Sequence, residues 1–371
     1  MATQMLGADT VTPRAAGFRM PAEWEPQAGV WMAWPERPDT WRLGAKPAQA
    51  AFARLANTIA RYEPVTMLVS AQQWGNAVRH LDRAVRVVEM STNDAWLRDT
   101  GASFLIDRDG HLAGVDWQFN GWGGLSDGLY FPWDADDAIA AKMCDLERAR
   151  RFRAPLVTEG GAIHVDGQGT VLTTEACLLN PNRNPGLDRA DVETALCDHL
   201  GTDRVIWLND GVPDDITGGH VDNLACFVAP GVVLLSWCDD PADPHYAVSR
   251  DAEARLLAAR DAKGRALRVE RIPMPTPMFL TAEEASGLDR TNPRLSSAEG
   301  DRLAASYVNF LIVNGAVIAP AFGVPTDAAA EAILSGLFPT HAIVMLPSRE
   351  ILLGGGNIHC VTQQQPQPRG A

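Results

Sequence analysis

Alternating runs of apolar and polar residues mark four places along the chain as β-hairpins. At each place, two short apolar runs flank a tight-turn pair that contains glycine, which tolerates the backbone angles that such turns require. The expected hairpins cover residues 102–117, 162–174, 223–237 and 306–320, with turns at Asp109-Gly110, Asp166-Gly167, Pro230-Gly231 and Asn314-Gly315. Their regular recurrence indicates a repeated structural unit.

Each hairpin is followed by a helical pattern and then by a short apolar strand. In the helical patterns, apolar residues recur at three- and four-residue spacing. Helices are predicted at 136–152, 188–200, 249–263 and 325–338, and the strands that follow them at 155–157, 204–208, 267–272 and 342–346. The last helix opens with proline and aspartate, as the free N–H groups and the dipole of a helix start prefer.

The N-terminal part of the chain fits a fifth unit of the same kind. Its elements are predicted as strands at 29–34, 65–70 and 85–90 and helices at 47–62 and 71–83. One such unit cannot bury its apolar face alone, so the five units are expected to close around a common axis in an α/β fold. An open α/β sheet with hairpin insertions is the alternative.

Charge and composition limit the classes of function. The chain has 371 residues and a formal net charge of −14, which argues against nucleic acid as a partner and mildly favours cationic ligands. Its six cysteines form no CxxC pair, so neither a metal cluster nor a disulfide framework is expected. With no signal peptide and no long apolar run in the sequence, a cytoplasmic protein that binds no membrane is predicted.

Unusual polar residues gather in the four joints between a short strand and the next hairpin. The joints are residues 91–101, 158–161, 209–223 and 354–360, and each combines glycine with carboxylates, histidine or cysteine. In pseudo-equivalent units, all joints lie at the same end and converge. Two joints begin almost the same phrase, "EGGAIHV" and "GGGNIHC", in which glycine lets the backbone pass close to its neighbours.

A cysteine in these acidic surroundings poses a chemical problem. Neighbouring carboxylates raise the pKa of a thiol, whereas a nucleophilic cysteine must be a thiolate. A cationic ligand removes the contradiction, because a guanidinium group held by two carboxylates would favour the thiolate of Cys360 and present an electron-poor carbon to it. Asp99 and Asp222 are the candidate carboxylates.

His220 is the candidate acid and base. It stands two residues before Asp222, so on a strand the two side chains would share a face, and Glu159 is expected to orient the imidazole and raise its pKa. By the same alternation, His359 is expected to point away from the face that Cys360 uses and to be structural. Taken singly, such residues are more typical of turns and caps, so the functional interpretation depends on their joint occurrence.

Six motifs in the chain resemble those of the agmatine deiminase group, within the bacterial-type peptidyl-arginine deiminase family of the guanidino-modifying (pentein) superfamily. They are "PAEWEPQAGVWMAWP" (21–35), "NDAWLRDTG" (93–101), "EGGAIHVDGQGTVLTTE" (159–175), "GGHVDN" (218–223), "YVNFLIVNGAVIAPAFG" (307–323) and "GGGNIHCVTQQ" (354–364). The fold that this resemblance implies is a five-bladed α/β propeller around a central active site, in agreement with the repeat.

The resemblance implies a role for each matching residue. Cys360 matches the nucleophile that forms a covalent amidino-thioether and expels ammonia, and His220 matches the general acid and base. Asp99 and Asp222 match the carboxylates that grip the guanidinium, and Glu159 matches the partner of the histidine. The resemblance implies no metal or organic cofactor, because the substrate carbon is already electrophilic.

Other residues of the joints are open to two interpretations. Trp96 matches an indole that lines the substrate channel, with a core tryptophan as the alternative. Asp214 and Asp215 are candidates to bind a distal ammonium, or else solvated loop acids. Gly218 stands where many family members have Asp or Asn, which could change the far end of the substrate site. Arg98, the one cation in the joints, is expected in an internal salt bridge.

The implied activity is the hydrolysis of agmatine to N-carbamoylputrescine and ammonia by one catalytic domain, residues 18–364. The ends, 1–17 and 365–371, are expected to be flexible, and a homodimer is expected from the resemblance alone. A loop at 119–138, rich in glycine and tryptophan, is either a water-excluding lid or a plain surface turn.

The alternatives are another guanidino substrate such as peptidyl arginine, an amidinotransferase, and a non-catalytic propeller that binds partners through its acidic face. A papain-like protease is disfavoured, because its cysteine needs a helix N-terminus and Cys360 is expected to follow its glycines into a strand.

Overall fold

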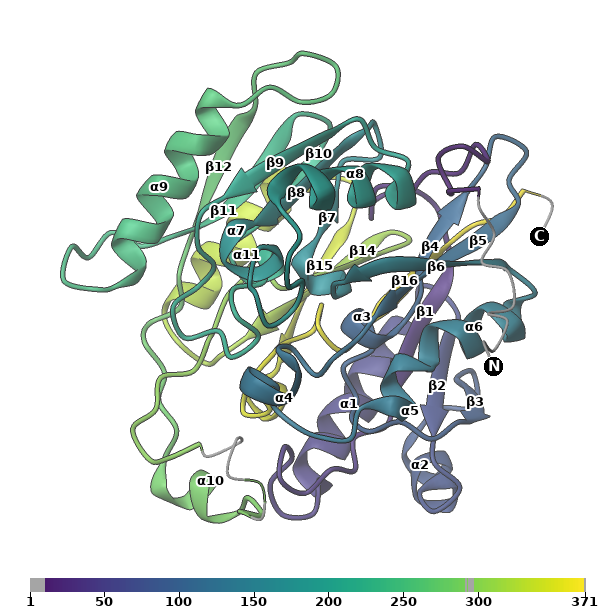
Figure 1. Ribbon diagram of the computed structural model, residues 1–371. Helices are drawn as coiled ribbons and strands as arrows, with labels where there is room; N and C mark the ends of the chain where they lie inside the picture. The colour runs from purple at the N-terminus through teal and green to yellow at the C-terminus, as the bar shows by residue number, and fades with distance from the viewer. Residues whose placement is uncertain (1–10, 291, 293–296, 370–371) are drawn as a thin grey trace.

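Five small β-sheets form the framework of the protein, as seen in a computed structural model that describes residues 11–290, 292 and 297–369. Figure 1 shows the sheets grouped around the middle of the molecule, with helices such as α9 (His245–Ala258) at the periphery. The propeller predicted from the five repeated units is confirmed. Among the described residues, no helix is long and apolar enough to cross a membrane.

Four of the sheets repeat one topology. An antiparallel hairpin is followed by a helix and by a third strand that lies parallel to the second strand of the hairpin. The strands are β4 (Ser103–Ile106), β5 (Leu112–Gln118) and β6 (Arg150–Val157); β7 (His164–Val165), β8 (Thr170–Thr174) and β9 (Arg204–Leu208); β10 (Ala225–Ala229), β11 (Val232–Trp237) and β12 (Arg268–Pro273); β13 (Leu311–Val313), β14 (Ala316–Ala321) and β15 (Ala342–Pro347).

The crossover helices lie close to their predicted places. They are α6 (Ile139–Glu147), α8 (Arg189–Leu200), α9 (His245–Ala258) and α11 (Thr326–Leu337). The prediction for α6 was too long, because Arg148 takes a left-handed conformation (φ 52°) that ends the helix before β6. The prediction for α9 was shifted toward the C-terminus. The helix begins earlier, where the Asp243 carboxylate accepts the backbone N–H of His245, and it ends where Ala259 becomes extended.

Shorter helical segments occur in the joints and in the loops between the repeats. They are α3 (Leu97–Thr100), α4 (Gly124–Asp127), α5 (Asp134–Asp137), η1 (Gly160–Ala162), α7 (Glu175–Leu178), η2 (Val221–Asn223), α10 (Ala282–Ser286) and α12 (Arg349–Leu352). Of these, α3, η1 and η2 pack against one another, so three joints do converge, as the repeat predicts.

The fifth sheet joins the two ends of the described chain. Its order is β16 (Gln363–Pro366), β1 (Gln27–Ala33), β2 (Val65–Val69) and β3 (Arg86–Glu89), with helices α1 (Lys46–Ile59) and α2 (Trp74–His80) between the three parallel strands. Helix α1 buries Phe52, Leu55 and Ile59, whose three- and four-residue spacing gives it one apolar face.

The expectation that the C-terminal segment is flexible from residue 365 was wrong for Gln365 and Pro366. They belong to β16, which pairs antiparallel with β1. The buried Gln365 amide accepts a hydrogen bond from Trp31 Nε1 (2.7 Å) and donates one to Glu147 (3.0 Å). At the other end, Arg14 pairs with Asp203, and residues 1–10 and 370–371 lie outside the described part of the chain.

We predict that Gln365→Ala lowers the free energy of unfolding by about 1–3 kcal/mol, because it leaves the indole N–H of Trp31 buried without an acceptor. The measurement is urea unfolding followed by tryptophan fluorescence. The control is Gln367→Ala, whose side chain is exposed. Equal loss of stability in the two variants would contradict a structural role for the β16 side chains.

Candidate active site

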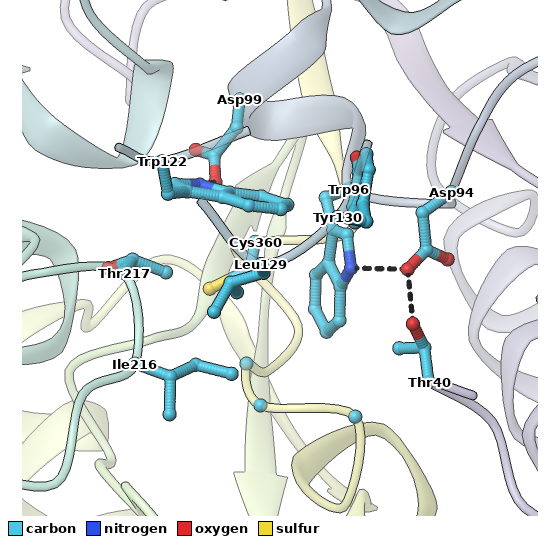
Figure 2. Close-up of a pocket in the computed structure, with 13 residues that line it drawn as sticks. Thr40, Asp94, Trp96, Asp99, Trp122, Leu129, Tyr130, Ile216, Thr217 and Cys360 are labelled. Atoms are coloured by element: carbon cyan, nitrogen blue, oxygen red, sulfur yellow. Dashed lines mark hydrogen bonds between the residues drawn. The ribbon is translucent and has the colours of Figure 1, made fainter. Parts of the chain in front are cut away.

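The joints between the repeats enclose a narrow cavity at the centre of the molecule. It is lined by Thr40, Asp94, Trp96, Asp99, Trp122, Leu129, Tyr130, Ile216, Thr217, Gly354, Gly355, Gly356 and Cys360. Figure 2 shows the sulfur of Cys360 between Trp122 and Ile216. The structure thus brings Cys360, Asp99 and Trp96 to one cavity, with His220, Asp222 and Glu159 buried beside them.

Glycine in the two repeated phrases permits this close convergence. A methyl group on Gly161 would lie 2.6 Å from His220 Nδ1 and 2.9 Å from both the Asp222 Oδ2 and the Asp99 Oδ1 atoms. The corresponding Gly356 would place a methyl group 2.6 Å from the Trp96 ring and 3.1 Å from the Cys360 sulfur. All of these distances are shorter than van der Waals contact, so the site requires glycine at both positions.

His220 lies between two carboxylates. Its Nε2 atom is 3.4 Å from Glu159 Oε2, and its Nδ1 atom is 3.8 Å from Asp99 Oδ1. Burial disfavours the imidazolium, but Asp99, Cys177 and Glu159 together raise the pKa of His220 well above its ordinary value. The imidazole is therefore protonated and ready to donate.

Glu159 is held ionised by Arg183, whose Nε atom donates to its Oε1 at 2.9 Å. Burial would raise the pKa of Glu159, but Arg183 and His220 outweigh it and hold the pKa at about 2. Arg183 also donates to the backbone carbonyl of Thr217. The pair supports the predicted role of Glu159 in orienting the histidine, and it adds an arginine that sequence reasoning missed.

The two candidate guanidinium-binding carboxylates differ in their environment. Burial raises the pKa of Asp99 to about 6, with Asp222 and Glu159 adding to the rise and His220 opposing it. Asp99 also accepts hydrogen bonds from Gly161 N and Trp122 Nε1, both at 2.9 Å. For Asp222, burial is outweighed by His359, which lowers the pKa. Its Oδ1 atom is buried without a hydrogen-bond partner.

Cys360 lies in acidic surroundings, as the sequence predicts. Its sulfur is 3.1 Å from Asn309 Nδ2 and 3.6 Å from Asp222 Oδ2. Burial, followed by the charges of Asp222 and Asp99, raises the pKa of the Cys360 thiol well above its ordinary value. The cysteine is therefore a neutral thiol while no cation is bound.

The local conformations differ from the predicted strands. His220 immediately precedes the 3₁₀ turn η2 and Asp222 lies within it, and Cys360 lies in a turn that precedes β16. Their side chains therefore converge because the backbone turns at each joint, and not because they alternate along a strand. His359 lies outside the cavity lining, and its two ring nitrogens are hydrogen-bonded to Asp222 and Glu23.

Aromatic side chains form the walls of the cavity. Trp96 is stacked on Trp41 with ring centroids 5.0 Å apart, and its Nε1 atom donates to Asp94, which also accepts from Thr40 (Figure 2). Trp122 packs edge-on against Tyr130. Both come from the 119–138 segment, which covers the site with Leu129 as well, so the lid interpretation is favoured over the plain surface turn.

Four further residues from the sequence prediction lie outside the cavity. Asp214 is paired with Arg302 (3.0 Å) and His245 (3.2 Å) in a neighbouring hollow, and this pairing disfavours its predicted contact with a substrate ammonium. Asp215 accepts hydrogen bonds from the backbone of Thr217 and His220.

Gly218 and Arg98 also have structural surroundings. A methyl group on Gly218 would lie 2.9 Å from Arg183 Nη1, so this glycine makes room for the arginine that holds Glu159. The buried Arg98 forms the expected internal salt bridge, with Glu23 at 3.4 Å.

Sequence reasoning missed Glu23, Arg183 and Asn309, although each contacts a residue of the site. They come from segments outside the glycine-rich joints on which the sequence reasoning concentrated. Asn309 lies in the quoted "YVNFLIV" motif, and its amide contacts Cys360 and its carbonyl oxygen accepts from His359 N at 3.0 Å. A buried polar residue inside that apolar run was the available signal.

Comparison with known proteins agrees with this geometry. The Porphyromonas-type peptidyl-arginine deiminase family matches residues 19–366. An agmatine deiminase from Pseudomonas putida is 58% identical over 359 residues, which cover 96% of this chain and 98% of the relative.

Two solved structures are similar over nearly their whole length. An agmatine deiminase of Enterococcus faecalis is 47% identical with a TM-score of 0.94, over 99% of this chain and 100% of that one. A cysteine-to-serine variant of the C. jejuni agmatine deiminase with substrate bound is 25% identical with a TM-score of 0.81, over 95% of this chain and 97% of that one. This chain therefore belongs to the Porphyromonas-type peptidyl-arginine deiminase family.

Proposed function

We propose that this protein is an agmatine deiminase, a hydrolase that converts agmatine and water to N-carbamoylputrescine and ammonia. The observation that carries the proposal is the placement of two buried carboxylates beside one thiol, with Asp222 Oδ1 still lacking a hydrogen-bond partner. A planar cation with several N–H donors satisfies such a site, and the names of the similar proteins support agmatine as that cation.

Binding and ionisation are coupled in this mechanism. Asp99 and Asp222 accept hydrogen bonds from the guanidinium nitrogens and set its carbon against Cys360. The positive charge of the substrate, added to that of His220, offsets the carboxylates that keep the thiol neutral. Cys360 then releases its proton to solvent water and becomes the nucleophile.

Two chemical steps follow. The Cys360 thiolate forms a bond to the guanidinium carbon, and a proton from His220 lets the C–N bond break with release of ammonia, which leaves an amidino-thioether on the enzyme. His220, now neutral, takes a proton from water, whose oxygen bonds to the same carbon. The hydroxyl of the tetrahedral adduct then gives its remaining proton to solvent as the C–S bond breaks, and N-carbamoylputrescine leaves as the thiolate is restored. Glu159 holds the histidine in both steps.

The cavity lining favours an amine-ended substrate over free arginine. Trp96, Trp122 and Ile216 offer apolar contact to a methylene chain. Among the described residues that line the cavity, none is an arginine or lysine that could bind an α-carboxylate. Another guanidino amine is the nearest alternative substrate.

The remaining expectations complete the proposal. Residues 18–364 act as one catalytic domain, in a cytoplasmic homodimer that binds neither nucleic acid nor membranes. The free state of all six cysteines agrees with a reducing compartment, and the acidic net charge agrees with a cationic substrate.

The direct test is ammonia release from agmatine, measured beside free arginine and a blocked arginine peptide. We expect turnover of agmatine, and a loss of kcat by more than about a thousandfold in Cys360→Ala. Cys197→Ala, which removes a half-buried thiol on α8, is the matched control and should retain activity. Turnover of arginine or the peptide in preference to agmatine would contradict the proposed substrate.

Gly161→Ala should lower kcat/KM for agmatine by about a hundredfold or more, because the added methyl group displaces His220, Asp222 or Asp99. The matched control is Gly75→Ala in α2, where a methyl group meets no atom within 4 Å. Similar kinetics of the two variants would show that the site has room at Gly161.

Agmatine affinity should weaken as the pH falls through about 6. The raised pKa of Asp99, about 6, means that this carboxylate is ionised above that pH and becomes neutral below it. In a Cys360→Ala background, Kd measured by calorimetry should rise toward tenfold per pH unit below the midpoint. In a Cys360→Ala/Asp99→Asn protein, the same dependence should be absent, and its persistence would assign it to another group.

A further inference from the structure

Three buried side chains, Glu23, His359 and Asp222, form a hydrogen-bonded row that ends at one of the two candidate guanidinium-binding carboxylates. Glu23 Oε1 lies 2.8 Å from His359 Nε2, and His359 Nδ1 lies 2.9 Å from Asp222 Oδ2. The exposed fractions are 5%, 3% and 2% for Glu23, His359 and Asp222. This row of side chains connects the segment before β1 to the loop of Cys360 and to η2.

The geometry fixes the protonation of His359. A carboxylate accepts hydrogen bonds but does not donate them, so an imidazole between two carboxylates must carry a hydrogen on each nitrogen. Burial and Arg98 oppose this state, but Glu23 and Asp222 raise the pKa of His359. The His164 ring stacks on His359 at 6.2 Å between centroids, and its Nε2 atom lies 3.7 Å from the same Glu23 Oε1 atom.

A metal ion is a poorer explanation of this cluster. Glu23, His164 and His359 lie close enough to bind one. However, the Arg98 guanidinium already lies 3.4 Å from Glu23, and both nitrogens of His359 are paired with carboxylates. A cation there would meet Arg98 and replace the charge-assisted hydrogen bond between His359 Nε2 and Glu23, so the cluster is complete as it stands.

The row leaves one oxygen of Asp222 without a hydrogen-bond partner. His359 takes Oδ2, the atom that lies 3.6 Å from the Cys360 sulfur, while Oδ1 is buried without a partner. The His359 backbone N–H is itself anchored to Asn309 Oδ1 at 3.0 Å, so the imidazole has a fixed position. The hydrogen bond from His359 therefore restricts the rotation of the Asp222 carboxylate about its side-chain bonds.

We propose that Glu23 and His359 are positioning residues that keep Asp222 ionised and turned so that its free oxygen binds the substrate guanidinium. This inference rests on the proposed function and adds to it two residues that lie outside the substrate cavity. Neither is expected to touch the substrate. Their effect on binding therefore passes through Asp222 alone.

The test is a double-mutant cycle on agmatine binding, measured by calorimetry in a Cys360→Ala parent that cannot turn over. His359→Gln should raise Kd by at least about tenfold, because the amide nitrogen of glutamine can donate to only one of the two carboxylates that flank the imidazole. In an Asp222→Asn background, the same His359→Gln change should raise Kd by less than about twofold. A residue that only stabilises the fold would have the same effect in both backgrounds.

Two further variants keep the test decisive. Glu23→Gln retains the shape of the side chain and should raise Kd by at least about threefold, again only when Asp222 is present; it decides the question if His359→Gln does not fold. His199→Gln is the matched control, because His199 is a buried histidine whose ring contacts Ala195 and Trp117, and its Kd should equal that of the parent.

The outcomes separate the two proposals. If the parent binds agmatine while the losses from His359→Gln and Asp222→Asn simply multiply, or while Glu23→Gln and His359→Gln bind like the parent, the positioning role is wrong and the proposed function stands. A parent that does not bind agmatine contradicts the proposed function, and the positioning inference with it.

Discussion

The centre of this protein depends on a balance of buried charges. Four carboxylates face four cationic side chains: Glu23, Asp99, Glu159 and Asp222 against Arg98, Arg183, His220 and His359. Removal of one partner from a buried ion pair costs about 3–5 kcal/mol, so each of these groups constrains the others. A bound guanidinium adds one positive charge, and ionisation of Cys360 restores the balance. Substrate binding and activation of the thiol are in this way one electrostatic event.

The propeller fold makes this balance of charges possible, because it brings short joints from distant parts of the sequence together. Asp99, Glu159, His220 and Cys360 each follow the last strand of a different repeat, and α3, η1 and η2 pack against one another at the centre. Glycine at 161 and 356 lets these joints approach within a distance that any side chain would prevent. Rigid sheets behind the joints hold the polar groups in place while the 119–138 segment covers them.

Much of this arrangement could be predicted from the sequence, because hairpin turns and repeated glycine phrases are local signals. Together with the three- and four-residue spacing of apolar positions, they located β9 to the residue, α8 and α11 to within one residue at each end, and the joints that carry Cys360 and His220. The rest depends on long-range contacts that leave no local pattern. Glu23 and Arg183 acquire their roles only by folding against His359 and Glu159, and β16 is a glutamine-rich strand ordered by pairing with β1. His220 and Asp222 were likewise expected on a strand, but the structure has the 3₁₀ turn η2 at this place.

The most direct test of the account is the ionisation of Cys360, measured by thiolate absorbance as the difference between wild-type and Cys360→Ala protein. The free protein should show no thiolate at neutral pH, since burial and the nearby carboxylates raise the thiol pKa. Addition of millimolar guanidinium ion, which fills the carboxylate pair, should produce the thiolate signal at the same pH. A thiolate already present in the free protein, or none in the presence of the cation, would contradict the coupling of binding to activation.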